Sequence, residues 1–294
     1  MRPLLLLPIL LALLLPAPLH AQAPPSTDLV AAGDAAWARR AEGHRGGQAA
    51  AGPVDEAIGA YEHAVKEQPA RLEAAWKLLR ALFFKGEHVA RSREDKQRVF
   101  GHGKEVAEAA VDRLAQVALK AGGRAKLDAM SPAQAAKALA GVPEAAPVIL
   151  WAGVHWGLWG DSFGRIAAAR QGVGDKIRRY AEIGIALDER YDEAAGHRLL
   201  GRLQDQAPKV PFFTGWVDRD KAVSELRRAV ALAPDNDLNQ LYLAEALLDH
   251  QSAKAAEARG ILRKLIARPP SPNRAVEDEK AVADARALLA RNAG

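Results

Sequence analysis

Cysteine is absent from the 294-residue chain, and aromatic residues make up only 5% of it. Without cysteine the chain forms no disulfides and has no cysteine for a lipid anchor, so an exported fold has to rely on its apolar core. Aromatic residues are scarce while alanine is abundant. This balance favours helix over sheet, because alanine is the best helix former and strands are rich in β-branched and aromatic residues.

A dense basic run is also missing. The chain has 41 Lys and Arg against 36 Asp and Glu, and the two signs are interspersed. Mixed charges of this kind are typical of solvated helix faces and do not indicate a nucleic-acid-binding surface. The scattered histidines follow neither H-x3-H nor H-E-x-x-H spacing, so the sequence predicts no metal site and indicates no cofactor.

The long apolar run of this chain stands at its start. Residues 1–23 carry one charge, Arg2, then an apolar stretch over 4–15, and end in the sequence A-Q-A. This pattern indicates a Sec-type signal peptide, with cleavage after Ala21 or after Ala23. The stretch is too short to span a membrane, and no later segment is long enough. We therefore expect a soluble protein, periplasmic or otherwise exported, without stable membrane insertion.

Residues 24–294 are expected to form a single helical repeat domain. Three segments share the spacing of the second helix of a tetratricopeptide repeat (TPR), in which small residues let paired helices approach, a larger side chain fills the gap and proline follows the helix. The matching residues are Ala57, Tyr61, Ala64 and Pro69; then Ala222, Leu226, Ala229 and Pro234; then Ala258, Leu262, Leu265 and Pro270.

The clearest repeat units cover residues 54–85, 176–204 and 218–268. Between them, Ser131 followed by Pro132 indicates the start of a short helix. A capping helix with a solvated side is expected over 275–291, because solenoids need a polar outer face at their ends. The predicted fold class is therefore all-α: a compact, TPR-like helical-hairpin solenoid that leaves room for a central cleft or pore.

Residues 148–170 hold three of the six tryptophans. On a helix with about 100° per residue, these tryptophans and one histidine share a broad face, while three glycines share another that lets a neighbouring helix approach closely. The aromatic face is either inter-helix core, the commoner case, or the lining of a cavity for an apolar or planar ligand. The candidate lining residues are Trp151, His155, Trp156 and Trp159, with Arg165 as an anion contact.

The sequence G-D-S-F-G over 160–164 matches the G-x-S-x-G motif of serine hydrolases. That chemistry needs Ser162 on a strand-to-helix turn with a histidine base, and no set of strands is predicted around it. Asp161 and Ser162 are more typical of a cap on a helix that continues through residues 166–169. We therefore expect a protein that is not an enzyme, with a serine esterase using Ser162 as a remote alternative.

Three segments are characteristic when taken together: WAGVHWGLWGD (151–161), YAEIGIALDERYDEAAGHRLLGRL (180–203) and PFFTGWVDRDKAVSELRRAVALAPDN (211–236). They resemble the TatT family, the TPR-containing T components of tripartite ATP-independent periplasmic (TRAP) transporters. The resemblance covers roughly residues 54–268 and is best over 147–250. It implies an all-α set of TPR-like hairpins with a pore or cleft, which works beside the periplasmic substrate-binding protein of the transporter.

Two functions follow as expectations. The first is an exported accessory protein that binds a small organic ligand, docks the substrate-binding protein of a TRAP-type transporter, or does both. The alternative is a generic TPR scaffold for protein–protein interaction in the cell envelope, in which the tryptophans would be core residues. The two functions differ in whether the aromatic side of the helix predicted over residues 148–170, the tryptophan helix, faces other helices or a cavity.

Overall fold

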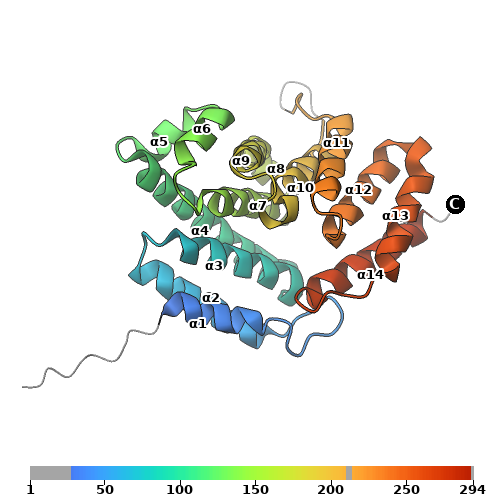
Figure 1. Ribbon diagram of the computed structural model, residues 1–294, viewed down its shortest axis with the longest axis horizontal. Coiled ribbons are helices and arrows are strands. Elements are labelled where there is room, and N and C mark those ends of the chain that lie inside the picture. The colour runs from blue at the N-terminus through green and yellow to red at the C-terminus, as the bar shows by residue number, and fades with distance from the viewer. Residues whose placement is uncertain (1–27, 210–213, 293–294) are drawn as a thin grey trace, which may run out of the picture.

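The computed structural model describes residues 28–209 and 214–292, which fold into helices joined by loops (Figure 1). Within these ranges no strand forms, and Arg45 and Gln48 make an isolated β-bridge. The predicted signal peptide, residues 1–23, lies outside the described residues. None of the helices in the described part of the chain has the length and apolar character needed to cross a membrane.

The elements before the tryptophan helix are α1 (Leu29–Ala38), α2 (Ala51–Glu67), α3 (Leu72–Phe84), the π-helix η1 (Lys85–Val89), α4 (Arg93–Leu119), α5 (Gly123–Asp128) and α6 (Pro132–Leu139). From the tryptophan helix onward they are α7 (Ala145–Phe163), α8 (Arg165–Arg170), α9 (Val173–Leu187), α10 (Tyr191–Gln206), α11 (Arg219–Leu232), α12 (Asp237–His250), the 3-10 turn η2 (Ser252–Lys254), α13 (Ala255–Ala267) and α14 (Ala275–Arg291).

Consecutive long helices pack against each other in one row, from α1 to α4 and on through α7, α9 and α10 to α14. The short helices α5 and α6 fold back on α4 and α9, and α8 links α7 to α9. This arrangement is an all-α helical-hairpin solenoid, so the predicted fold class is confirmed. The start of α6 is also as predicted, because the Ser131 hydroxyl accepts a hydrogen bond from the Gln134 amide in a capping box.

The repeated spacing marks helix faces that are buried. All the alanine, tyrosine and leucine residues of the three matching segments lie inside the protein, on α2, α11 and α13. Tyr61 shows how the small and large positions fit, because its ring covers Gly33 of α1 so closely that a Cβ atom there would overlap it. Small residues thus set the short distance between paired helices, as the pattern predicts.

The last helix contacts the first hairpin. Val276 of α14 is fully buried in the cluster formed by α1, α2 and α3, and Arg40, just after α1, forms an ion pair of 3.1 Å with Glu277. His44 lies 3.5 Å from Glu279. Residues 275–291, for which a capping helix is predicted, form α14, and this helix joins the two ends of the array (Figure 1).

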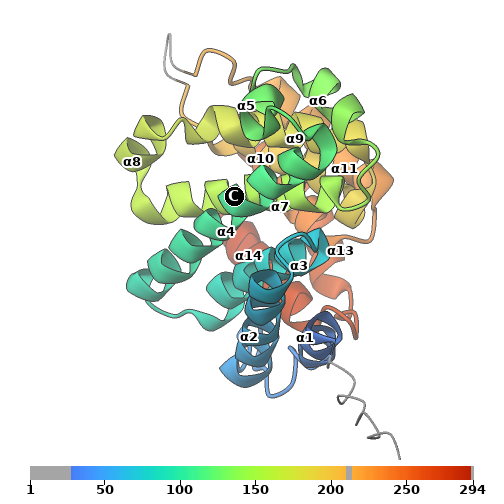
Figure 2. The ribbon, with the colours of Figure 1, turned by 90° about the vertical axis from the view of Figure 1, so that its left-hand side faces the viewer.

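The helix predicted to continue from Asp161 through residues 166–169 is interrupted. Gly164 has a φ of +93°, which favours glycine, and it separates α7 from α8. Asp161 and Ser162 lie in the last turn of α7 instead of capping the following helix, so that prediction is wrong. Figure 2 shows α8 projecting from the body at this break.

Candidate functional site

Trp151 and Trp156 of α7 pack against different neighbouring helices. Trp151 is 8% exposed and packs on Phe83 of α3, with 5.5 Å between ring centroids. Trp156 is 1% exposed and carries two lysines over its ring, with Lys104 Nζ 4.6 Å and Lys176 Nζ 3.6 Å from the centroid. The structure therefore does not bring Trp151 and Trp156 to one cavity, and Trp156 lies in the core between α4, α7 and α9.

His155 is completely buried between α3 and α4. Its Nε2 lies 2.8 Å from the Leu79 carbonyl oxygen, which can only accept, so Nε2 carries the proton. Burial lowers the pKa of His155 to about 4, so the imidazole is neutral at neutral pH. The other nitrogen, Nδ1, packs against Gly103, where a Cβ atom would overlap the ring. This environment favours the structural reading of His155 over the ligand reading.

Trp159 and Arg165 lie toward the outer end of the helix. Trp159 stacks on Phe163, with ring centroids 5.0 Å apart, and Phe163 is 40% exposed. Arg165 is exposed on the projecting helix α8. Trp156 and Trp159 are in edge contact, with 5.9 Å between ring centroids, and both lie under Lys104, whereas the other predicted lining residues lie elsewhere. The five residues therefore do not share one cavity, and a ligand role for each of them stays a prediction.

The glycine face of α7 packs as predicted. A Cβ atom on Gly153 would lie 2.8 Å from a Leu199 methyl carbon, and one on Gly160 would lie 3.2 Å from Val173. Both distances are shorter than ordinary packing allows. The glycines therefore let α7 lie close to the helices that follow it, which confirms the expected close approach.

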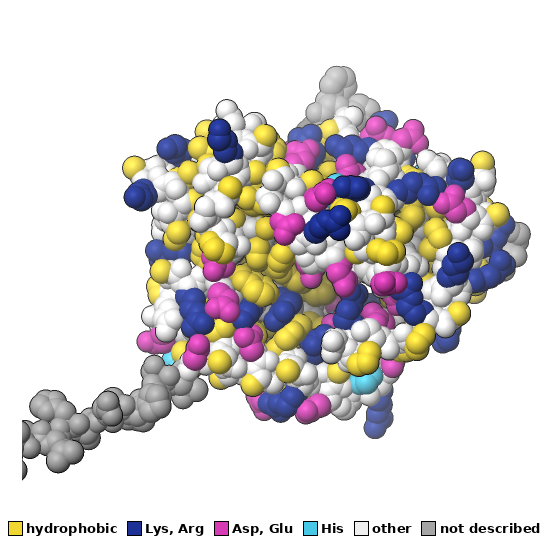
Figure 3. Space-filling model, in the orientation of Figure 1, with side chains coloured by type: hydrophobic (Ala, Val, Ile, Leu, Met, Phe, Trp, Pro, Cys, Tyr) yellow, Lys and Arg dark blue, Asp and Glu magenta, His cyan; other side chains and the backbone are white. Residues whose placement is uncertain are grey.

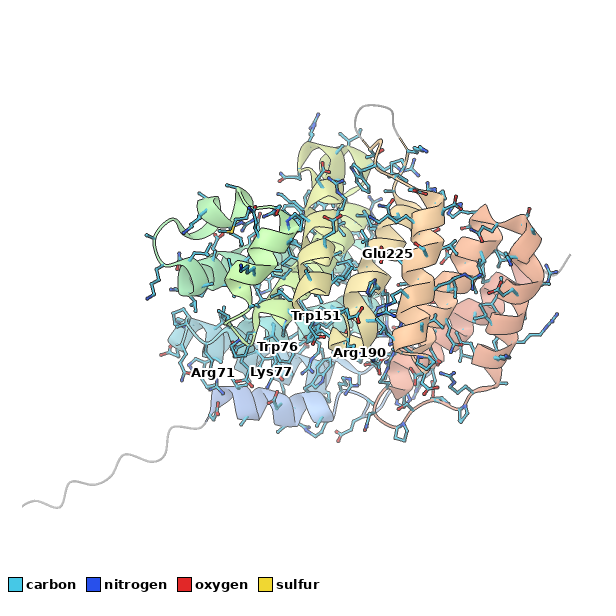
Figure 4. The ribbon with its side chains drawn as sticks, turned by 45° about the horizontal axis from the view of Figure 1, so that its top comes forward. Arg71, Trp76, Lys77, Trp151, Arg190 and Glu225 are labelled. Atoms are coloured by element: carbon cyan, nitrogen blue, oxygen red, sulfur yellow. The ribbon has the colours of Figure 1, made fainter. Side chains whose placement is uncertain are left out.

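A hollow lined largely by hydrophobic side chains opens in the middle of the face seen in Figure 3, with charged side chains around it. Trp76 of α3 and Trp151 of α7 belong to one apolar cluster and lie close together near the middle of the molecule in Figure 4. Contacts place three further side chains with them. We define the central hollow by these five residues, which are Trp37, Trp76, Arg80, Trp151 and Tyr191.

Arg80 is the charged group of the central hollow. Its Cζ lies 4.4 Å from the ring centroid of Trp37 and 5.2 Å from that of Trp76, so the guanidinium contacts two indoles. Its Nε is buried without a hydrogen-bond partner, and no carboxylate in the described ranges forms a direct ion pair with it, while the Tyr61 hydroxyl and the more distant Asp192 carboxylate interact with its guanidinium. Because the half-buried guanidinium forms no direct ion pair among the described residues, Arg80 can accept an anion.

Two polar groups next to Arg80 complete the central hollow. The Nε1–H of Trp151 is buried, and the neighbouring Tyr191 hydroxyl is the polar group that interacts with it. Burial raises the pKa of Tyr191, so its hydroxyl stays protonated. The central hollow thus offers a cation and a hydroxyl donor between aromatic walls.

A left-handed turn follows Tyr191 directly. Asp192, Glu193 and Ala194 have φ angles of 46°, 58° and 66°, a conformation that costs about 1–3 kcal/mol per non-glycine residue. Arg198 donates to the carbonyls of Asp192 and Glu193 and holds the turn in place. Arg274, next to α14, forms an ion pair with Glu193, so the closing helix also supports this side of the central hollow.

The sequence analysis missed four residues of the central hollow. Trp76 and Arg80 are four residues apart on α3 and so share a helix face. That spacing is readable in the sequence and could have drawn attention to them. Trp37 and Tyr191 come from α1 and α10, and only packing brings them to α3. Among the described residues, no group of three or more His, Asp and Glu side chains could hold a metal ion.

Ser162 lacks the setting of a hydrolase nucleophile. It lies in the last turn of α7, and its carbonyl oxygen accepts a hydrogen bond of 2.9 Å from the Gln97 side chain. The nucleophile of the G-x-S-x-G motif needs a strand-to-helix turn, and a helix supplies none. The geometry around Ser162 therefore does not favour the esterase alternative.

Models of known protein families do not match this chain. Curated protein sequences do not match it either. The functional proposals below therefore rest on the central hollow and the other described contacts, together with the resemblance stated for the sequence.

Proposed function

We propose that this chain is an exported accessory protein that binds a small organic ligand in the central hollow. We further propose that it works beside the periplasmic substrate-binding protein of a TRAP-type transporter. The observation that carries the ligand proposal is Arg80, whose guanidinium contacts the indoles of Trp37 and Trp76 and forms no direct ion pair with a described residue. The resemblance of residues 151–161, 180–203 and 211–236 to the TatT family supports the transporter context.

The chemistry of the central hollow fits an organic anion with an apolar body. A planar guanidinium binds a carboxylate through two parallel hydrogen bonds, and such bonds are strongest where water is excluded. The indoles of Trp76 and Trp151 supply apolar area for the rest of the molecule. The hydroxyl of Tyr191 next to Trp151 offers a further donor that can fix the orientation of the ligand.

The ligand proposal is tested by Arg80→Gln. Binding of a panel of aliphatic and aromatic carboxylates is measured by native mass spectrometry and isothermal titration calorimetry. We expect at least about tenfold weaker binding by the variant, because it loses a charged hydrogen-bonding partner. The matched control is Arg178→Gln, since Arg178 also covers an indole, that of Trp216 at 4.9 Å, outside the central hollow. Equal binding by wild type and Arg80→Gln would contradict the proposal.

The transporter context has its own test. A dicarboxylate-type binding protein and a membrane permease encoded by adjacent genes would support it. The purified binding protein would then be titrated with this chain, and a complex is expected at micromolar concentration. A ligand-binding chain that forms no complex with such a protein would retain the first part of the proposal and lose the second.

The scaffold alternative has one specific observation in its favour. Phe163 is 40% exposed and Ile166 is 71% exposed, both at the projecting junction of α7 and α8 (Figure 2). Large apolar side chains exposed together are typical of protein-binding surfaces. If the chain bound no small ligand while Phe163→Ser with Ile166→Ser abolished a protein complex, the scaffold function would be the better description.

A further inference from the structure

A second pocket lies where the two ends of the array meet. It consists of two adjoining open depressions of about 510 and 650 Å³ that share Glu87, Arg91 and Lys96. Its walls come from the loop after α1, η1 with the start of α4, the end of α7, and α14. We call it the seam pocket, and its charged lining residues are Arg45, Glu87, Arg91, Arg93, Lys96, Asp161 and Lys280.

The seam pocket has an excess of positive charge, with five cations against two carboxylates. Lys96 is paired with Glu87 at 3.3 Å, and Lys280 is paired with Asp284 at 2.7 Å. Arg45 and Arg91 form no ion pair with any residue in the described ranges. Like charges gathered in a concave surface repel each other and raise the local concentration of anions.

The local backbone holds the walls of the seam pocket together. His88 of η1 lies 3.1 Å from the Gly47 carbonyl through Nδ1, and its own carbonyl accepts a 2.8 Å hydrogen bond from the Ala49 amide. These contacts tie the loop that carries Arg45 to the π-helix that carries Glu87. Such π-helices are rare and occur frequently at functional sites.

The floor of the seam pocket is apolar, and its rim is polar. Phe100 and Leu158 lie beneath the charged groups, while Ser92 and Ser162 contribute oxygen atoms. Guanidinium groups bind phosphate and carboxylate with matching geometry, whereas lysines act as point charges. Since two free arginines and a lysine from three chain segments surround this space, a ligand with more than one negative charge would use all three.

We infer that the seam pocket binds a small multivalent oxyanion, such as a phosphate ester or a tricarboxylate, mainly through Arg45 and Arg91. The bound anion bridges the loop after α1, the start of α4 and Lys280 of α14. It therefore fastens the first hairpin to the last helix. This site is separate from the central hollow, and its ligand does not need to be the one bound by Arg80.

The test uses pyrophosphate and citrate as probes, with sodium chloride at matched ionic strength as the reference. Binding is measured by calorimetry and the midpoint of thermal unfolding by circular dichroism. We expect wild type to bind at least one probe and to gain thermal stability beyond the chloride effect. Arg45→Gln with Arg91→Gln should bind at least about tenfold more weakly. Both side chains are exposed, so this variant should fold normally.

The matched control is Arg263→Gln with Arg286→Gln, which removes the same charge from exposed positions outside the seam pocket. It should bind the probes within about twofold of wild type, because screened distant charges contribute little. No binding by wild type, or equal weakening in both double variants, would overturn the inference. Arg80→Gln should keep wild-type affinity for the probes, so failure of one site does not decide the other. The stronger probe identifies phosphate or carboxylate as the preferred group.

Discussion

The two halves of the array fill their interiors with different side chains. All six tryptophans precede α11, and the buried cluster of α11 to α14 consists of leucine, alanine and valine. The largest fully buried side chains of the first half are aromatic, among them Trp156, Tyr61 and Phe100. The regular TPR-like spacing also occurs twice in the second half, where consecutive hairpins follow each other without inserted helices.

The comparison concerns how the aromatic side chains are used. Helices that meet through alanine and leucine pack closely along their whole length. The first half carries large aromatic side chains, and some of them, such as Trp37 and Trp76, stay half-buried. Aromatic residues therefore serve two purposes in this chain, core filling at Trp156 and cavity lining at Trp76.

The largest expected effect on stability tests the distinction between tryptophans that fill the core and tryptophans that line the central hollow. Trp156→Ala removes a side chain that is 1% exposed and should lower the free energy of unfolding by about 3–5 kcal/mol, as measured by urea denaturation. Trp76→Ala removes a half-buried side chain, so it should cost less stability and weaken ligand binding more. If Trp76→Ala proved the more destabilising change and left binding intact, the distinction between core and central hollow would be wrong.

A lower pH should destabilise the folded protein through His155, which lies in the first half of the array. Burial lowers its pKa to about 4, whereas the unfolded chain has a value near 6.5. The unfolded state then binds more protons between these values, so stability is fully present above pH 6.5 and falls as the pH drops towards 4. The total loss is about 3 kcal/mol.

His155→Leu should flatten this part of the pH profile, measured by urea denaturation at several pH values between 7 and 4. His63→Gln, at an exposed position of α2, is the control and should keep the wild-type profile. A profile that is equally steep in His155→Leu and wild type would show that His155 is not the group responsible.

The smallest expected effect compares one glycine from each half. A Cβ atom on Gly184 of α9 would overlap the Leu150 side chain, so Gly184→Ala should destabilise the protein by about 1–3 kcal/mol. Gly260 of α13 has no atom within 4 Å of such a Cβ, and Gly260→Ala should stabilise its helix by up to about 1 kcal/mol. Thermal unfolding of both variants checks the opposite signs, and two changes of the same sign would contradict the difference in packing.

Most of the fold could be predicted from short-range patterns. The spacing of Ala222, Leu226 and Ala229 identifies a buried helix face, and Ser131 marks the start of α6, because both features depend on residues within one or two helical turns. The glycine face of α7 is predictable for the same reason. The break at Gly164 was missed, because glycine is compatible both with a helix and with the positive φ that ends one.

The sequence by itself determined the helical class, the paired helices and the close packing of α7, since these follow from periodicity and side-chain size. Only the tertiary structure decided that Trp156 is core while Trp76 and Arg80 line a hollow. The sequence shows which residues share a helix face, but not which other helix packs against that face. It also decided that α14 returns to α1. The seam pocket exists through that contact, which brings Arg45 and Lys280 together across most of the chain.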